Sequence, residues 1–231
     1  MGDYCATCGQ ARRTKRITFP SLVRSLIDNV LSVDSTLLRT FQALVRRPGP
    51  FIREFLLGRR VGFARPLPYY LLVVGLNVAA GAVFKSGPAS GNAAASSGSF
   101  WDNNFVALQL SLAYGALMLP VAAARRVLHE DAGYSVAEHF VCLLYVLSQS
   151  VLVLLAARAG LWVAGISITG DAEGLIFLAA FVGYAVWAAR GFLSEPLWKV
   201  ALKLVASFAM AIGGLGVVGL VVVRLVSALV H

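Results

Sequence analysis

The sequence has little charge, few acidic residues and few cysteines. Only 13% of its 231 residues are charged, whereas 58% are hydrophobic; a soluble domain carries about a quarter charged residues. Its three cysteines are too few for a disulfide framework, and we expect Cys5 and Cys8 to face a reducing cytosol. The first residues do not combine a charged segment with an apolar core, so no signal peptide is expected.

Catalytic motifs are also missing. There is no Ser-His-Asp set, His-Glu-x-x-His, phosphate loop or Gly-x-Ser-x-Gly, and we expect neither an enzyme nor catalytic residues. No expected membrane span carries Asp, Glu, Lys or Arg near its centre, which argues against an ion-coupled transporter. A passive pore or a lipid groove stays open. Interhelical hydrogen bonding is the role we favour for the polar residues of the spans, which are Asn77, Gln109, Ser111, Ser148, Gln149 and Ser150.

Long apolar stretches fill the chain after Leu67, and a bilayer crossing needs about 20 residues. The sequence therefore predicts an all-α integral membrane protein with about five transmembrane helices, preceded by short amphipathic interfacial helices. The expected spans are Leu67–Phe84, Phe105–Ala124, His139–Ala157, Leu175–Ala189 and Leu204–Val223. Residues 160–170 are apolar but too short to cross. They could extend the third span, re-enter the membrane or lie flat on it.

The chain divides into three parts: 1–16, a cytoplasmic Cys-x-x-Cys knuckle with a basic tail; 17–66, amphipathic helices; and 67–231, the transmembrane bundle. Within 17–66, apolar residues recur with helical spacing in 19–33 and again in 37–45. Pro50 suits the first turn of a third short helix, and Gly58 suits its end. Because residues 17–66 are too few to build a hydrophobic core of their own, we expect these helices to lie on the membrane surface.

Six arginines stand among apolar residues just before the first span. Basic residues at such a place can bind headgroup phosphates and follow the positive-inside bias. We expect lipid or partner contact from Arg46, Arg47, Arg53, Arg59, Arg60 and Arg65. The net charge of +9 could also suggest nucleic acid, but no nucleic-acid-binding module accompanies it, and we expect no nucleic-acid partner.

Basic residues also predict the orientation. With the N-terminus cytoplasmic and five spans, seventeen of the twenty Lys and Arg lie on the inner side, and only Lys85, Arg158 and Arg224 lie on the outer side. This bias predicts a cytoplasmic N-terminus and a periplasmic C-terminus.

Residues Cys5-Ala6-Thr7-Cys8-Gly9 have the spacing of one zinc-ribbon knuckle. Structural zinc takes four ligands, and the second pair is missing here. A second chain in a dimer could complete the site, as could His129 or His139. A remnant knuckle without metal, or an oxidation-sensitive cysteine pair, is the alternative that we favour.

A group of small residues has both a structural and a functional interpretation. Small residues that allow close helix approach occur at Gly75, Ala209, Gly213, Gly216 and Gly219. We favour packing of the last span on the first, rather than a homodimer seam.

Glu138 and His139 open the third span and could form an acid/base pair or bind a metal. We favour a structural role, in which Glu138 closes a capping box with Ser135 and His139 lies at the membrane interface.

The motifs at 5–10 (CATCGQ), 34–40 (DSTLLRT), 47–49 (RPG) and 58–60 (GRR), with 134–140 further on, resemble those of an uncharacterised bacterial membrane-protein family. That family is defined as a domain of unknown function over such an N-terminal region. The chain departs from that family at two positions where we would expect histidines and where it has Tyr145 and Ser148. This departure argues against a histidine-based site. The resemblance implies a multi-pass protein of the bacterial inner membrane and no activity. The five-span layout is also similar to Yip-one type proteins, which act in membrane organisation and trafficking.

These observations predict a non-enzymatic inner-membrane scaffold or assembly protein. Its basic N-terminal helices would bind the anionic inner leaflet or an acidic partner, and a membrane-protein partner or a homodimer would fit that role. The alternative is an oligomeric channel or small-molecule transporter. A water-filled path lined by Asn77, Gln109 and Gln149 would favour the channel, and a tightly packed, dry bundle would favour the scaffold.

Overall fold

The computed structural model describes residues 35–85, 104–130, 133–166, 170–192 and 196–230, and in these the chain forms seven α-helices and no strand. The helices are α2 (Ser35–Arg46), α3 (Pro48–Leu56), α4 (Pro66–Lys85), α5 (Asn104–Leu128), α6 (Val136–Val163), α7 (Gly170–Phe192) and α8 (Leu197–Val230). The prediction of an all-α protein is confirmed for the described residues.

Four of these helices, α5 to α8, are long and apolar enough to cross a membrane, which indicates a membrane protein. The apolar part of α4 at Pro66–Gly81 is shorter, so the predicted count of five spans depends on α4. Helix α6 continues through Val163, and Gly165 follows it with a φ of 71°. The start of the 160–170 stretch therefore extends the third span, which was one of the three alternatives.

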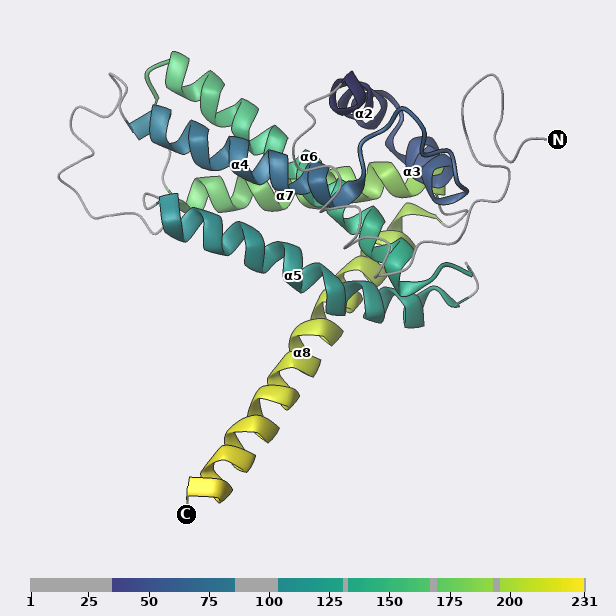
Figure 1. Cartoon of the computed structure of the whole chain (residues 1–231), viewed down its shortest axis with the longest axis vertical. Helices are drawn as coiled ribbons and strands as arrows, with labels where there is room; N and C mark the ends of the chain where they lie inside the picture. The colour runs from purple at the N-terminus through teal and green to yellow at the C-terminus, as the bar shows by residue number, and fades with distance from the viewer. Residues whose placement is uncertain (1–34, 86–103, 131–132, 167–169, 193–195, 231) are drawn as a thin grey trace.

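Helix α6 is the centre of the bundle. Every residue from Val141 to Val151 is buried, because α4, α5 and α7 all pack against this helix. Figure 1 shows α4 and α6 starting at the end of the bundle where α5 and α7 finish. We call this the basic end, since Arg125, Arg126 and Arg190 lie in the last turns of α5 and α7.

Helix α8 begins at the basic end and then leaves the bundle. Its main neighbours are α5 and α7, and its C-terminal part projects away from the other helices (Figure 1). An added Cβ at Gly75, Gly213 or Gly216 would meet nothing within 4 Å. These glycines have open space beside them, and α8 packs chiefly on α5 and α7, so the preferred packing of the last span on the first stays a prediction. Ala209 is exposed and Gly219 lies further along α8.

Helix α3 does not lie free on the bundle surface. It begins at Pro48, so Pro50 lies in its first turn as predicted, and Gly58, with a φ of 116°, follows its end as predicted. Its apolar side chains are buried against the chain's own helices, notably α7, rather than being open to lipid; they are Phe51, Ile52, Phe55 and Leu56. The sequence predicted that this helix lies on the membrane surface, whereas in the structure the bundle covers its apolar face.

Tyr145 of α6 fixes α3 in place. Its side chain is fully buried, and its ring contacts those of Phe51 and Phe55, each with centroids 5.6 Å away. Its hydroxyl donates a 2.7 Å hydrogen bond to the carbonyl oxygen of Ala64, in the segment that joins α3 to α4. Edge-to-face aromatic pairs and a buried hydrogen bond stabilise the same contact.

Graded substitution of Tyr145 should show how strongly this contact stabilises the fold. Tyr145→Phe loses the hydrogen bond and should lower the free energy of unfolding by about 1 kcal/mol. Tyr145→Ala also loses the ring and should cost roughly 3–5 kcal/mol, as aromatic truncation does in cores. The unfolding midpoints of the detergent-purified proteins measure both effects. Equal midpoints for wild type and Tyr145→Ala would contradict this role.

Candidate functional site

Helix α2 has one anchored side and one open side. Leu44 and Thr40 are fully buried. The Thr40 hydroxyl accepts a 2.7 Å hydrogen bond from the Ala64 amide, and the Tyr184 hydroxyl of α7 donates a 3.0 Å bond to the Leu44 carbonyl oxygen. These buried bonds tie α2 both to the segment before α4 and to α7, so the direction of its open side is set by the bundle.

The open side of α2 carries apolar residues next to polar ones. Leu38, Phe41 and Val45 are 61%, 38% and 46% exposed, and their spacing places them in one stripe along the helix. We call these three residues the outer face of α2. Arg39, Gln42 and Arg46, which follow it around the helix away from the buried side, are also exposed. This order of buried, apolar and basic sectors is typical of a helix at a membrane interface.

The six arginines predicted to contact lipid or a partner differ in their surroundings. Five are exposed, namely Arg46, Arg47, Arg53, Arg59 and Arg65. One of these five, Arg59, forms a 2.7 Å ion pair with Glu54 on the surface.

Arg60 is half-buried. Its Nε donates a 3.3 Å hydrogen bond to the Phe55 carbonyl oxygen, and its guanidinium lies 5.9 Å from the centroid of the Phe55 ring. Burial lowers the pKa of Arg60, while the Glu138 carboxylate acts in the opposite direction. Arg60 therefore supports the end of α3, in addition to any role on the surface.

The capping box predicted at the start of the third span is confirmed. The Ser135 amide donates a 2.7 Å hydrogen bond to a Glu138 carboxylate oxygen, and the Glu138 amide donates a 3.2 Å bond to the Ser135 hydroxyl. His139, predicted at the membrane interface, is fully buried within the protein. Its ring centroid lies 6.0 Å from that of His129 and 6.1 Å from that of Tyr134.

No metal site can be assembled from the described residues, since they contain no group of three His, Cys, Asp or Glu side chains that could hold an ion. Cys5 and Cys8 lie outside the described residues. Zinc binding by this pair, with or without His129 or His139, therefore stays a prediction.

The three amides proposed to line a water-filled path are not brought together. The Gln149 side chain is buried and donates a 2.6 Å hydrogen bond to the Tyr69 hydroxyl. Gln109 is exposed. Only Asn77 of the three lines the large pocket of the bundle, together with Ser111. Gln149 thus has the interhelical role that we favoured.

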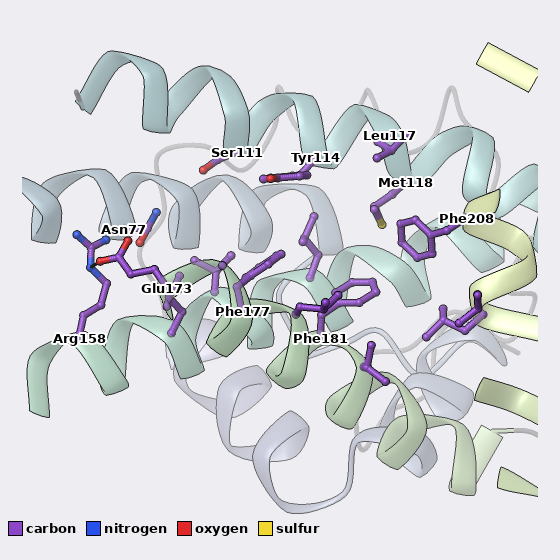
Figure 2. Close-up of a pocket in the computed structure, with 18 residues that line it drawn as sticks. Asn77, Ser111, Tyr114, Leu117, Met118, Arg158, Glu173, Phe177, Phe181 and Phe208 are labelled. Atoms are coloured by element: carbon purple, nitrogen blue, oxygen red, sulfur yellow. Dashed lines mark ion pairs between the residues drawn. The ribbon is translucent and has the colours of Figure 1, made fainter. Parts of the chain in front are cut away.

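This pocket has an ion pair at one end that the sequence pattern does not predict. Figure 2 shows Arg158 of α6 and Glu173 of α7 beside Asn77, with Phe177 and Phe181 further along the cavity. The Arg158 Nε and a Glu173 carboxylate oxygen are 3.2 Å apart. Both residues lie close to the ends of apolar stretches in the sequence, where charge is expected anyway. Only the ion pair that they form between two helices identifies them as part of a candidate site.

Part of the chain matches a known family model. Residues 34–77 match the family model described as "Protein of unknown function (DUF3667)". No curated protein and no solved structure matches the chain. The matched region spans α2, α3 and the first half of α4, which is the segment that carries the outer face of α2 and its anchoring bonds. The resemblance to an uncharacterised family is supported over this segment.

The Thr40 hydroxyl gives a specific test of how α2 is anchored. Thr40→Val keeps the shape of the side chain but leaves the buried Ala64 amide without an acceptor, so it should cost about 1–3 kcal/mol of stability. Thr36→Val is the matched control one turn earlier, at a half-buried position. Thermal unfolding in detergent should show a clear loss for the first variant and little change for the second. Equal losses would contradict the anchoring role of Thr40.

Proposed function

We propose that the protein is a non-enzymatic membrane scaffold or assembly protein that holds the outer face of α2 against an anionic membrane surface. The observation that supports this proposal is the fixed order of sectors around α2. Buried bonds anchor one side, the apolar stripe of Leu38, Phe41 and Val45 comes next, and exposed Arg39 and Arg46 follow. Such a helix inserts apolar side chains among lipid headgroups while its arginines meet phosphates.

Exposed arginines around this face supply the electrostatic part of the proposed contact. Arg47 follows α2 directly, and Arg53 lies exposed on α3. Each Lys or Arg near an anionic leaflet contributes about 1 kcal/mol of attraction, which salt weakens. Several such residues together are therefore sufficient to hold a helix that is already attached to a membrane bundle.

The charge pattern supports a cytoplasmic location for the basic end. Arg125 and Arg126 close α5, Arg190 lies in the last turn of α7, and Lys199 and Lys203 lie in the first two turns of α8. With α4 as the first of five spans, the positive-inside bias puts these residues in the cytoplasm and the C-terminus outside. We propose this topology, in a bacterial inner membrane, as the setting for the α2 contact.

A scaffold suits the described residues better than a channel does. The Gln149 side chain is hydrogen-bonded to Tyr69, Gln109 is exposed, and the side chains that line the pocket are mostly apolar. An acidic protein partner remains the competing occupant of the arginine-rich surface, and a lipid-sensitive experiment separates it from the membrane.

The proposal can be tested with a fluorophore on α2 of the full chain in proteoliposomes. With Cys5 and Cys8 changed to Ser and Cys142 buried, an environment-sensitive dye at Phe41→Cys should report an apolar surrounding when the lipids are anionic. Dye emission should be red-shifted in vesicles of neutral lipid. Adding Arg46→Glu and Arg47→Glu, or raising the salt concentration, should reduce the difference between the two lipid mixtures.

The matched control is the same dye at Gln42→Cys, on the polar sector of the same helix. Its emission should change little with lipid charge. If Phe41→Cys and Gln42→Cys gave the same response, or if the charge reversals left the anionic response intact, the membrane-docking proposal would fail.

A further inference from the structure

The cavity between the long helices has the size of a ligand site. Its volume is about 540 Å³, and residues from α4 to α8 line it. Small-molecule sites range over about 300–1,000 Å³ and combine apolar walls with a few polar groups. This cavity is independent of the proposed docking of α2, since it lies inside the bundle and is lined by other residues.

The greater part of the cavity is apolar. Phe177 and Phe181 of α7, Phe208 of α8 and Met118 of α5 line one continuous stretch, as Figure 2 shows. The rings of Phe181 and Phe208 meet edge to face with centroids 5.7 Å apart. A wall of this kind, within helices suited to a membrane, accommodates a hydrocarbon chain.

The other end of the cavity is polar and has an unused acceptor. The Asn77 Oδ1 is buried without a hydrogen-bond partner. Arg158 and Glu173, whose side chains are 18% and 13% exposed, form their ion pair beside it. A buried polar atom without a partner costs free energy, so a ligand that donates a hydrogen bond to Asn77 would relieve that cost.

The position of the polar end suits an amphiphile lying parallel to the membrane lipids. Arg158 is in the last two turns of α6, and Glu173 is in the first turn of α7. The apolar stretch runs from there toward the middle of the helices (Figure 2). A lipid in one leaflet has the same arrangement, with its headgroup near the helix ends and its chains toward the centre.

The charges of the polar end select among lipid headgroups. Arg158 and Glu173 already neutralise each other, so a ligand with net charge would compete for one of them and leave the other without its partner. A zwitterion avoids this, because its phosphate can pair with Arg158 and its cation with Glu173. Only a cation that carries N–H groups can also donate to Asn77 Oδ1, which a quaternary ammonium cannot do.

We propose that this cavity is a binding site for a phospholipid with a primary-amine zwitterionic headgroup, phosphatidylethanolamine being the simplest. One acyl chain lies along Phe177, Phe181 and Phe208. The ammonium binds Glu173 and Asn77, and the phosphate binds Arg158.

The test is native mass spectrometry of the full-length protein released from detergent after incubation with an equimolar mixture of four lipids. These are phosphatidylethanolamine, phosphatidylcholine, phosphatidylglycerol and diacylglycerol, all with the same chains. The wild type should retain one phosphatidylethanolamine with about a tenfold preference over each of the other lipids. Retention without preference, or a preference for another headgroup, would overturn the proposal.

Two glycines of α7 provide a matched pair of variants. Gly174 lines the cavity, Gly183 does not, and an added Cβ at either position meets nothing within 4 Å. Both changes to Leu raise helix propensity equally, but only Gly174→Leu fills the cavity. Lipid retention should fall at least about tenfold in Gly174→Leu and stay at the wild-type level in Gly183→Leu. Equal retention in the two variants would show that the lipid binds elsewhere on the protein.

The double variant Arg158→Gln/Glu173→Gln supplies a second readout in case Gly174→Leu fails to fold. It leaves no unpaired charge and keeps the apolar walls. It should still retain a lipid, but the preference for phosphatidylethanolamine over phosphatidylglycerol should fall to near unity. An unchanged preference in this variant would contradict headgroup selection by the ion pair.

Discussion

The seating of α3 against Tyr145 is the contact on which the rest of the described structure depends. Two phenylalanine rings of α3 meet the tyrosine ring, and the tyrosine hydroxyl holds the chain at Ala64. Ala64 in turn donates to Thr40 of α2. A single buried side chain of the central helix thus fixes α3, the approach to α4 and, through Thr40, the direction in which α2 faces. Together with the bond from Tyr184 to Leu44, this contact sets the direction in which the apolar stripe and the arginines of α2 face.

The two proposed sites differ in how their charged residues are exposed and paired. At the basic end, Arg46, Arg47 and Arg53 are exposed, so their attraction is toward mobile anions at a surface and falls with ionic strength. Arg158 and Glu173 are largely removed from solvent and paired, so they discriminate by complementarity rather than by net attraction. Under the two proposals, the protein responds to the average charge of a leaflet at one end and to a particular headgroup at the other.

The sequence predicted local features well and tertiary partners poorly. Hydrophobic stretches located the long helices, and Ser135 with Glu138 predicted the start of α6, because a capping box involves only neighbouring residues. Helix α3 was expected on the membrane surface, but the bundle covers its apolar side chains, because an amphipathic pattern cannot say whether lipid or protein covers a face.

Tyr145 shows the same limit at a single residue. The family that the sequence resembles is expected to have a histidine at this position, so Tyr145 is a departure from the family. In the structure it packs against α3 and donates a hydrogen bond to Ala64. The Arg158–Glu173 pair could not be foreseen either, since the residues come from different helices and each alone resembles a charge at a helix end. The glycines of α8 are a third example. Small residues indicate that another helix can approach closely, but they do not identify that helix, and an added Cβ at Gly213 or Gly216 would meet nothing within 4 Å.

The most direct measurement is photo-crosslinking from Phe41 in native membranes. A benzophenone amino acid at this position of the full chain places the reactive carbonyl on the outer face of α2, which is exposed. If α2 docks on the membrane, irradiation should attach membrane phospholipid, identified by the mass of the labelled peptide. Attachment to another protein as the main product would contradict membrane docking and would identify the outer face as a protein interface.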